Sequence, residues 1–213
     1  MNRRAWLYFL AVSLLWGIPY FFIKVALRDL GPVAIAFVRV AIGAAVLLPL
    51  ALRSGSLAWV KERWPQAIVL GLVEVALPFS LIPAGEESIP SSLAGILIAT
   101  EPLMIALVAI PFDPSERVGS MRLLGLLVGL AGVVVMLGLG GGGVSLVGAA
   151  LILLATLGYS VGALLVKRWF SDVPPTGVAT STLCVGAVAL LVPAALGAPH
   201  SAPSGATVVA LLI

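Results

Sequence analysis

The chain has 213 residues, of which 61% are hydrophobic and only 10% are charged, and its formal net charge is +3. A soluble domain carries about 25% charged residues, so this composition excludes an ordinary soluble protein and indicates a membrane protein. The basic residues stand at the ends of apolar runs, so they indicate orientation in a bilayer and no nucleic-acid partner. With Cys184 and His200 as the only cysteine and histidine, the chain is expected to form no internal disulfide and to hold no metal or cofactor.

Apolar runs of about 20 residues, long enough to cross a bilayer, follow one another along the chain. They predict an all-α multi-pass membrane protein with seven helical spans and the start of an eighth. These are Ala5–Val25, Pro32–Leu52, Gln66–Pro83, Ile89–Ile110, Met121–Leu139, Ser145–Val166, Thr176–Leu196 and Thr207–Ile213.

Lysine and arginine gather in alternate loops, which predicts the orientation. If the spans alternate in direction, one side receives Arg3, Arg4, Arg53, Lys61, Arg63, Arg117, Arg122, Lys167 and Arg168. Cytoplasmic loops are enriched in basic residues, so the N-terminus is predicted to be cytoplasmic. The opposite loops hold Glu86 and Glu87, and Lys24 is expected to extend to the interface on that side as an anchor.

The fourth predicted span carries a carboxylate near its middle. At about 1.5 Å per residue, Glu101 lies roughly 18 Å from Ile89, near the centre of a hydrocarbon core about 30 Å thick. Ionisable groups at this depth usually face a bundle interior or a water-filled cavity. Pro102 cannot donate to the carbonyl of Ile98, so we expect a break that lines a cavity or, alternatively, an ordinary proline kink.

An ungapped shift of 143 residues aligns parts of the chain with each other. Lys24 then matches Lys167 and Pro32 matches Pro175 (167 − 24 and 175 − 32), and Gly43 matches Gly186. Five spans separate the copies, so they cross the membrane in opposite directions, as inverted repeats do in transporters. The expected domains are a five-helix repeat over residues 1–139 and a second repeat over residues 145–213 that is cut short after about two and a half helices.

Several short motifs together resemble the EamA-domain family of the drug/metabolite transporter superfamily. They are Trp16-Gly17 with Lys24, Arg39 before AIGAAVLLPL, Glu101-Pro102-Leu103, Glu116-Arg117 before LLGLLVGLAGVVVML, and the segment Gly148–Arg168. The resemblance implies a ten-helix, two-repeat carrier of the bacterial inner membrane that moves small metabolites, often outward. Where the family commonly has an uncharged polar residue before the proline of the fourth span, this chain has Glu101.

The predicted substrate or ion site is a polar cavity near the midplane. Arg39, Glu74 and Glu101 are its charged groups, and Pro102 loosens the helix beside Glu101. Desolvation favours the neutral form of a buried acid, which suits proton coupling. The alternative for the charged pair is that Arg39 only locks Glu74 in place. Further residues that could line the cavity are Trp16, Pro19, Tyr20, Tyr159 and Ser160, although packing is the simpler role for each.

The function predicted from these residues is secondary-active transport of a small molecule, with proton coupling as a hypothesis. The family resemblance implies that the transporter is an exporter. The expected partners are the lipid bilayer, the substrate and protons, and a homodimer is compatible with the sequence. The sequence shows no nucleophile paired with a base, no set of metal ligands and no phosphate-binding loop. We therefore do not expect an enzyme. The alternatives are a channel-like bundle, a membrane scaffold and an inactive transporter fragment.

Overall fold

The computed structural model describes residues 3–109, 124–125, 127–129, 131–133, 135, 145–197 and 202–212, and in these residues every regular element is helical. The first half contains α1 (Arg3–Ala26), α2 (Pro32–Ser54), η1 (Ser56–Trp59), η2 (Lys61–Arg63), α3 (Trp64–Leu70), η3 (Gly71–Ala76), α4 (Leu77–Glu86), α5 (Ser91–Ile98) and α6 (Glu101–Ala109). The second half contains α8 (Leu146–Trp169), α9 (Pro175–Leu196) and α10 (Gly205–Leu212).

Six helical segments of the described residues are long and apolar enough to cross a membrane. They are Ala5–Ala26, Pro32–Ser54, Ser56–Glu86, Ser91–Ala109, Leu146–Trp169 and Pro175–Leu196. They confirm the first four predicted spans and the sixth and seventh as helical segments, and α10 coincides with the predicted start of an eighth. The predicted fifth span, Met121–Leu139, lies for the most part outside the described residues.

The third span is longer than the sequence predicted. Gln66–Pro83 was expected, but the helical path begins with short 3-10 turns at Ser56 and continues to Glu86. Pro83 lies inside α4 and does not end it, because membrane helices tolerate prolines where the freed backbone groups find other partners. The prediction that Glu86 lies in a loop was therefore wrong, since it is the last residue of α4 and its side chain is fully buried.

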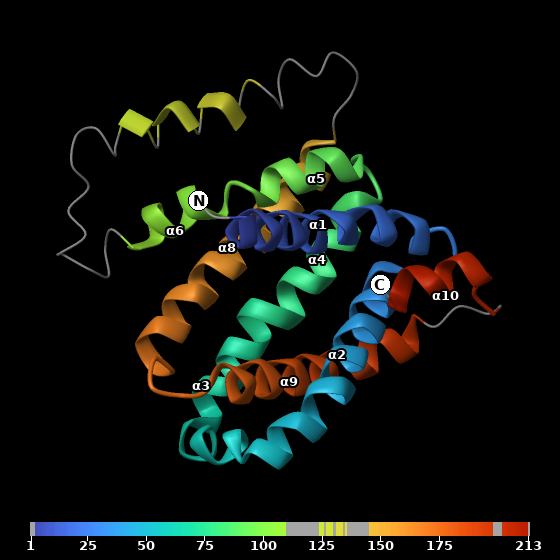
Figure 1. Cartoon of the computed structure of the whole chain (residues 1–213). Coiled ribbons are helices and arrows are strands. Elements are labelled where there is room, and N and C mark those ends of the chain that lie inside the picture. Colours follow the sequence, from blue (N-terminus) through green and yellow to red (C-terminus); the bar gives the residue numbers. More distant parts are fainter. Residues whose placement is uncertain are drawn as a thin grey trace.

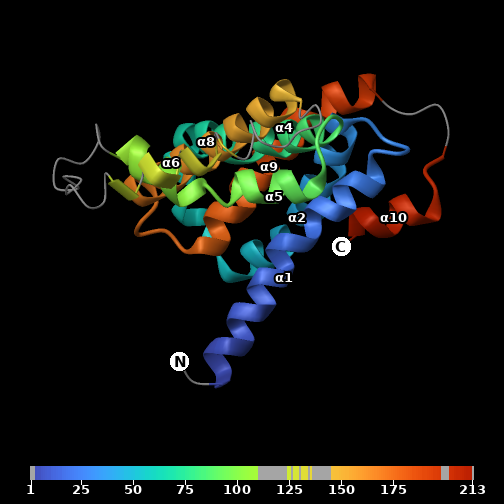
Figure 2. The same ribbon diagram turned by 90° about the horizontal axis from the view of Figure 1, so that it is seen from above.

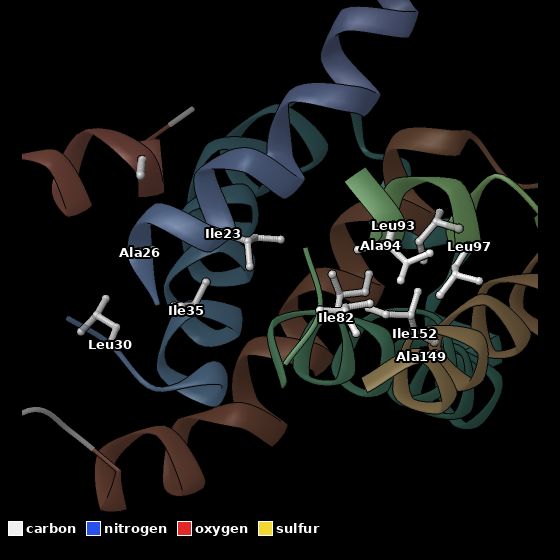
Figure 3. Close-up of a cluster of buried hydrophobic side chains, with 14 residues drawn as sticks. Ile23, Ala26, Leu30, Ile35, Ile82, Leu93, Ala94, Leu97, Ala149 and Ile152 are labelled. Atoms are coloured by element: carbon white, nitrogen blue, oxygen red, sulfur yellow. The ribbon is translucent and has the colours of Figure 1, made fainter. Parts of the chain in front are cut away.

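The helices pack through small residues. A Cβ on Gly85 of α4 would come within 2.8 Å of the carbonyl oxygen of Gly148 in α8, so the two backbones are in direct contact there. Close approach through glycine and alanine is the usual way for membrane helices to associate. Figure 3 shows Ala94 and Leu97 of α5 beside Ile152 of α8 in the largest cluster of buried apolar side chains.

The two halves of the chain are interleaved. In Figure 1, α2 and α9 lie side by side, and α10 lies next to α1. In the same arrangement α8 packs along α4. The N-terminal half of α1 projects away from the other labelled helices in Figure 2, and its side chains there are exposed. Helix α1 of the first half thus contacts α10 of the second, and α8 of the second half contacts α4 of the first.

Candidate functional site

Glu74 lies in a widened turn of the third span. The segment η3, Gly71–Ala76, is a π-helix, and the N–H of Leu77 donates to the carbonyl of Leu72. Pro78 explains the widening, because it cannot donate to the carbonyl of Glu74 four residues earlier and its ring would clash with that carbonyl in a regular helix. Such π-turns occur frequently at functional sites.

Two glycines of α8 make room for this turn. A Cβ on Gly162 would lie 2.8 Å from both Cβ and Cγ of Glu74, and one on Gly158 would lie 2.8 Å from the carbonyl oxygen of Val73. The two glycines are four residues apart and form the small-residue pattern that allows close helix contact. That pattern, Gly-Tyr-Ser-Val-Gly, is visible in the sequence and is the signal that could have predicted this contact.

Glu101 lies at the point where the fourth span is interrupted. The α-helix ends at Ile98 and a new one starts at Glu101, so Ala99 and Thr100 form a break within the four residues before Pro102. The hydroxyl of Thr100 donates a hydrogen bond to the backbone carbonyl of Leu97 at 2.6 Å. The expected interruption beside Glu101 is therefore present, and Pro102 lies in the first turn of α6, where a missing N–H is tolerated.

The widened turn and the break open onto one cavity of about 340 Å³, a volume at the low end of the range for small-molecule sites. Five of the predicted site residues line it, from five different spans: Trp16 of α1, Arg39 of α2, Glu74 of the third span, Glu101 of α6 and Tyr159 of α8. The remaining lining residues are Leu15, Pro19, Tyr20, Ile23, Phe79, Ile82 and Ala163.

Pro102 does not line this cavity. It borders an adjoining groove of about 520 Å³ between α1 and the α5–α6 segment, to which Trp16, Tyr20 and Glu101 also contribute. Ser160, also predicted near the cavity, is fully buried and donates to the carbonyl of Thr156 at 2.8 Å. Its hydroxyl also lies 3.4 Å from the backbone carbonyl oxygen of Glu101, so it stands where α8 meets α6.

Arg39 does not lock Glu74 in place. Among the described residues, the ion pair within 4.0 Å is that of Arg63 with Asp172, and Arg39 forms none. The guanidinium carbon of Arg39 instead lies 5.8 Å from the ring centroid of Phe79, a distance that allows a cation–π interaction. The alternative of an Arg39–Glu74 pair was wrong, and both acids of the cavity are without a basic partner in the described part of the chain.

The structure also gives partners to residues that the sequence had placed at the surface. The ammonium of Lys24 donates to the backbone carbonyl of Glu86 and to that of Ile89, the latter at 3.1 Å. It therefore ties α1 to the α4–α5 connection instead of extending freely to the interface. Lys24 stands four residues after Tyr20, on the same helix face as that cavity residue, which is the signal that could have indicated an inward role.

Two aspartates connect the halves of the chain. Asp29, between α1 and α2, accepts hydrogen bonds from Ser204 N, Ser204 Oγ and Thr207 Oγ1 at 2.8, 2.6 and 2.6 Å, at the start of α10. Asp172, between α8 and α9, pairs through both oxygens with Arg63 before α3, at 2.6 and 2.8 Å. These hydrogen bonds lower the pKa of Asp29 to about 2, and the bond from Arg63 lowers the pKa of Asp172.

No group of three or more His, Cys, Asp and Glu side chains that could hold a metal ion occurs in the described residues. The charged groups that line the cavity are Arg39, Glu74 and Glu101, and aromatic side chains lie beside them. Such a lining can bind a small polar or aromatic molecule and can exchange protons, but it offers no nucleophile with an adjacent base.

Comparison with known proteins gives consistent results. The model of the EamA-like transporter family matches residues 3–138. An "Uncharacterized transporter YvbV" of Bacillus subtilis is 28% identical over 180 residues, which cover 84% of this chain and 59% of that protein. An "Uncharacterized inner membrane transporter YedA" of Escherichia coli is 27% identical over 183 residues, with 85% and 59% covered.

A protein of known crystal structure is also similar to this chain, with a TM-score of 0.60 and 25% sequence identity. The alignment covers 95% of this chain and 73% of that protein. The chain spans about 59% of the length of the two transporters named above. These relatives carry the names of transporters and not of enzymes. Because the family model covers more than half of the 213 residues, the chain belongs to the EamA-like transporter family.

Proposed function

We propose that this chain forms the substrate-binding part of a secondary-active transporter that exports small metabolites across the cytoplasmic membrane. The single observation that carries the proposal is the cavity in which Arg39, Glu74 and Glu101 meet from three different spans. Charged groups inside a membrane domain are costly, and they are retained where they serve a substrate or ion pathway.

The proposal includes two inverted repeats, over residues 1–139 and residues 145–213. Reciprocal contacts between α2 and α9 support it. A Cβ on Gly43 would lie 3.3 Å from Leu183, and a Cβ on Gly186 would lie 3.2 Å from Val40. Gly186 and Leu183 stand 143 residues after Gly43 and Val40 (186 − 43 and 183 − 40), so the two contacts exchange under the repeat register, as contacts across a two-fold axis do.

The two aspartates support the same register. Asp172 follows Asp29 by 143 residues (172 − 29), and each lies between the first and second helices of its proposed repeat. Each also binds the beginning of the third span of the opposite repeat. Asp29 binds Ser204 and Thr207 at the start of α10, and Asp172 binds Arg63 of η2, directly before α3. Inverted repeats of this kind allow one half to rock against the other around a site near the midplane.

Protons are the proposed coupling ion, and the N-terminus is proposed to be cytoplasmic. Glu101 faces the cavity without a basic partner in the described residues, so its carboxyl group can bind a proton in one state of the cycle and lose it in another. Arg39 offers a positive charge for an anionic group of the substrate, and Trp16 and Tyr159 offer aromatic faces.

Flux measurements in proteoliposomes test this function. Radiolabelled amino acids, nucleosides and sugar phosphates, together with the fluorescent cation ethidium, are the probes, each with and without an imposed pH gradient. We expect saturable flux of at least one probe that follows the gradient in the wild-type protein and loses this dependence in Glu101→Gln. Flux that does not saturate would indicate a channel, and unchanged pH dependence in Glu101→Gln would remove Glu101 as the coupling residue.

A further inference from the structure

A second carboxyl group is buried away from the central cavity. Glu86, the last residue of α4, has no exposed surface. Its Oε2 lies 3.0 Å from the hydroxyl of Ser91 in α5, while its Oε1 is buried without a hydrogen-bond partner in the described part of the chain. Burying an ionised carboxylate with an unsatisfied oxygen costs far more free energy than burying the neutral acid.

The hydrogen bonds around Ser91 also fit the neutral acid. The Ser91 hydroxyl lies 3.1 Å from the carbonyl oxygen of Tyr20 and 3.0 Å from Oε2 of Glu86. A hydroxyl has one hydrogen to donate. Both contacts are hydrogen bonds at once only if Ser91 donates to Tyr20 and accepts a proton-bearing Oε2 of Glu86.

The position of Glu86 at the end of α4 also favours the neutral acid. The C-terminal end of α4 carries the negative end of the helix dipole, which disfavours a carboxylate there. Lys24 uses its ammonium for the backbone carbonyls of Glu86 and Ile89, and no ion pair within 4.0 Å joins it to the Glu86 carboxyl group in the described residues.

The charged and titratable groups around Glu86 come from three directions. Lys24 and Tyr20 face it from α1, and Arg39 acts on it from α2. Glu87 follows it in the chain and is exposed. On the side of α8, the contacts at Gly85 are with Gly148 and Ile152, which carry no charge. Lys24 and Arg39 would attract an ionised Glu86, so loss of its proton would draw Lys24 away from the two carbonyls.

Glu86 lies between two hollows of the protein. Its neighbour Tyr20 lines the central cavity, and its neighbours Lys24 and Ser91 line a surface hollow of about 430 Å³ that also contains Arg28 and Glu87. We propose that Glu86 is a proton-binding site that stands between this surface hollow and the central cavity and holds a proton in the structure described. Its part in coupling rests on the proposed function, whereas the bound proton does not.

Infrared difference spectroscopy of the purified protein in lipid tests the site without a substrate. A protonated carboxyl group has a carbonyl stretching band that an ionised carboxylate lacks. We expect a band at neutral pH that disappears on alkaline titration, is lost in Glu86→Gln and is retained in the matched control Glu87→Gln. A Glu86→Gln spectrum identical to wild type at every pH would overturn the proposal, and so would loss of the band on adding Na⁺ at constant pH.

A second measurement covers the case in which Glu86→Gln does not fold. A hydrophobic carbodiimide reacts with protonated carboxyl groups, and peptide mass spectrometry of the wild-type protein locates the adduct. We expect Glu86 to be labelled at neutral pH and to lose this labelling in alkali, which would support the site. The proposal is overturned if Glu86 is not labelled and the infrared spectrum also lacks the carboxyl band at neutral pH. If Glu86 carries the proton but no probe follows a pH gradient, the site stands and the proposed coupling fails.

Discussion

The side chain of Glu74 lies directly against Gly162, where a Cβ would come within 2.8 Å of the Cβ and Cγ of Glu74 and 3.1 Å of its Cδ. The absence of a side chain on Gly162 therefore leaves the space beside α8 that the Glu74 side chain occupies. The widened turn of the third span and the glycine of a distant helix are two parts of one arrangement that sets the shape of the cavity.

The substitution Gly162→Ala should consequently displace Glu74. We expect it to destabilise the protein by about 1–3 kcal/mol, the usual cost of an additional methyl group in a packed core. The measurement is thermal unfolding in detergent. Gly17→Ala is the matched control, because a Cβ on Gly17 meets no atom within 4 Å. Equal melting temperatures for Gly162→Ala and wild type would contradict this contact.

Replacing Pro102 by alanine should change the fourth span. Without the proline ring, the N–H of residue 102 can donate to the carbonyl of Ile98, so α5 and α6 can join in one continuous helix. We expect Pro102→Ala to retain or increase thermal stability while flux and its pH dependence fall, because Glu101 moves relative to the cavity. Unchanged flux would show that the interruption is not required.

The contact of Asp29 with α10 should give a pH-dependent contribution to stability. The bonds from Ser204 and Thr207 lower the pKa of Asp29 from 3.8 to about 2. A carboxyl group whose pKa is lower in the folded state stabilises the protein above its unfolded pKa and loses this effect as the pH falls through the folded pKa.

We therefore expect Asp29→Asn to lower the melting temperature at neutral pH, with a difference from wild type that shrinks as the pH falls from about 4 toward 2. Melting curves of both proteins at several pH values provide the test. Glu87→Gln, which removes an exposed carboxylate, serves as the control. A difference that is constant over this pH range would argue against a role for the Asp29 carboxylate.

The pair of Arg63 and Asp172 can be tested by exchange. Arg63→Asp and Asp172→Arg should each lower the melting temperature, and the double substitution should recover part of the loss. Recovery should be incomplete, because Arg63 also donates to the carbonyl of Trp169 at 2.6 Å, which an aspartate cannot do. Strictly additive effects of the two single substitutions would indicate that the pair contributes nothing.

The sequence by itself determined the membrane class, six of the spans and the residues worth testing. Apolar length is a local property, so the spans are visible without tertiary contacts. A charge inside an apolar run is equally visible, which is why Arg39, Glu74 and Glu101 could be singled out before the structure placed them around one cavity.

Only the tertiary structure decided which groups meet. Lys24 binds backbone carbonyls, which leave no mark in the sequence, and Pro83 resembled the end of a span although α4 continues past it to bury Glu86. The place of Glu74 depends on Gly162, a residue 88 positions away (162 − 74), whose lack of a side chain matters only where two helices touch. Such partners are set by the packing of whole helices, because each contact requires a particular approach of backbones that no local pattern specifies.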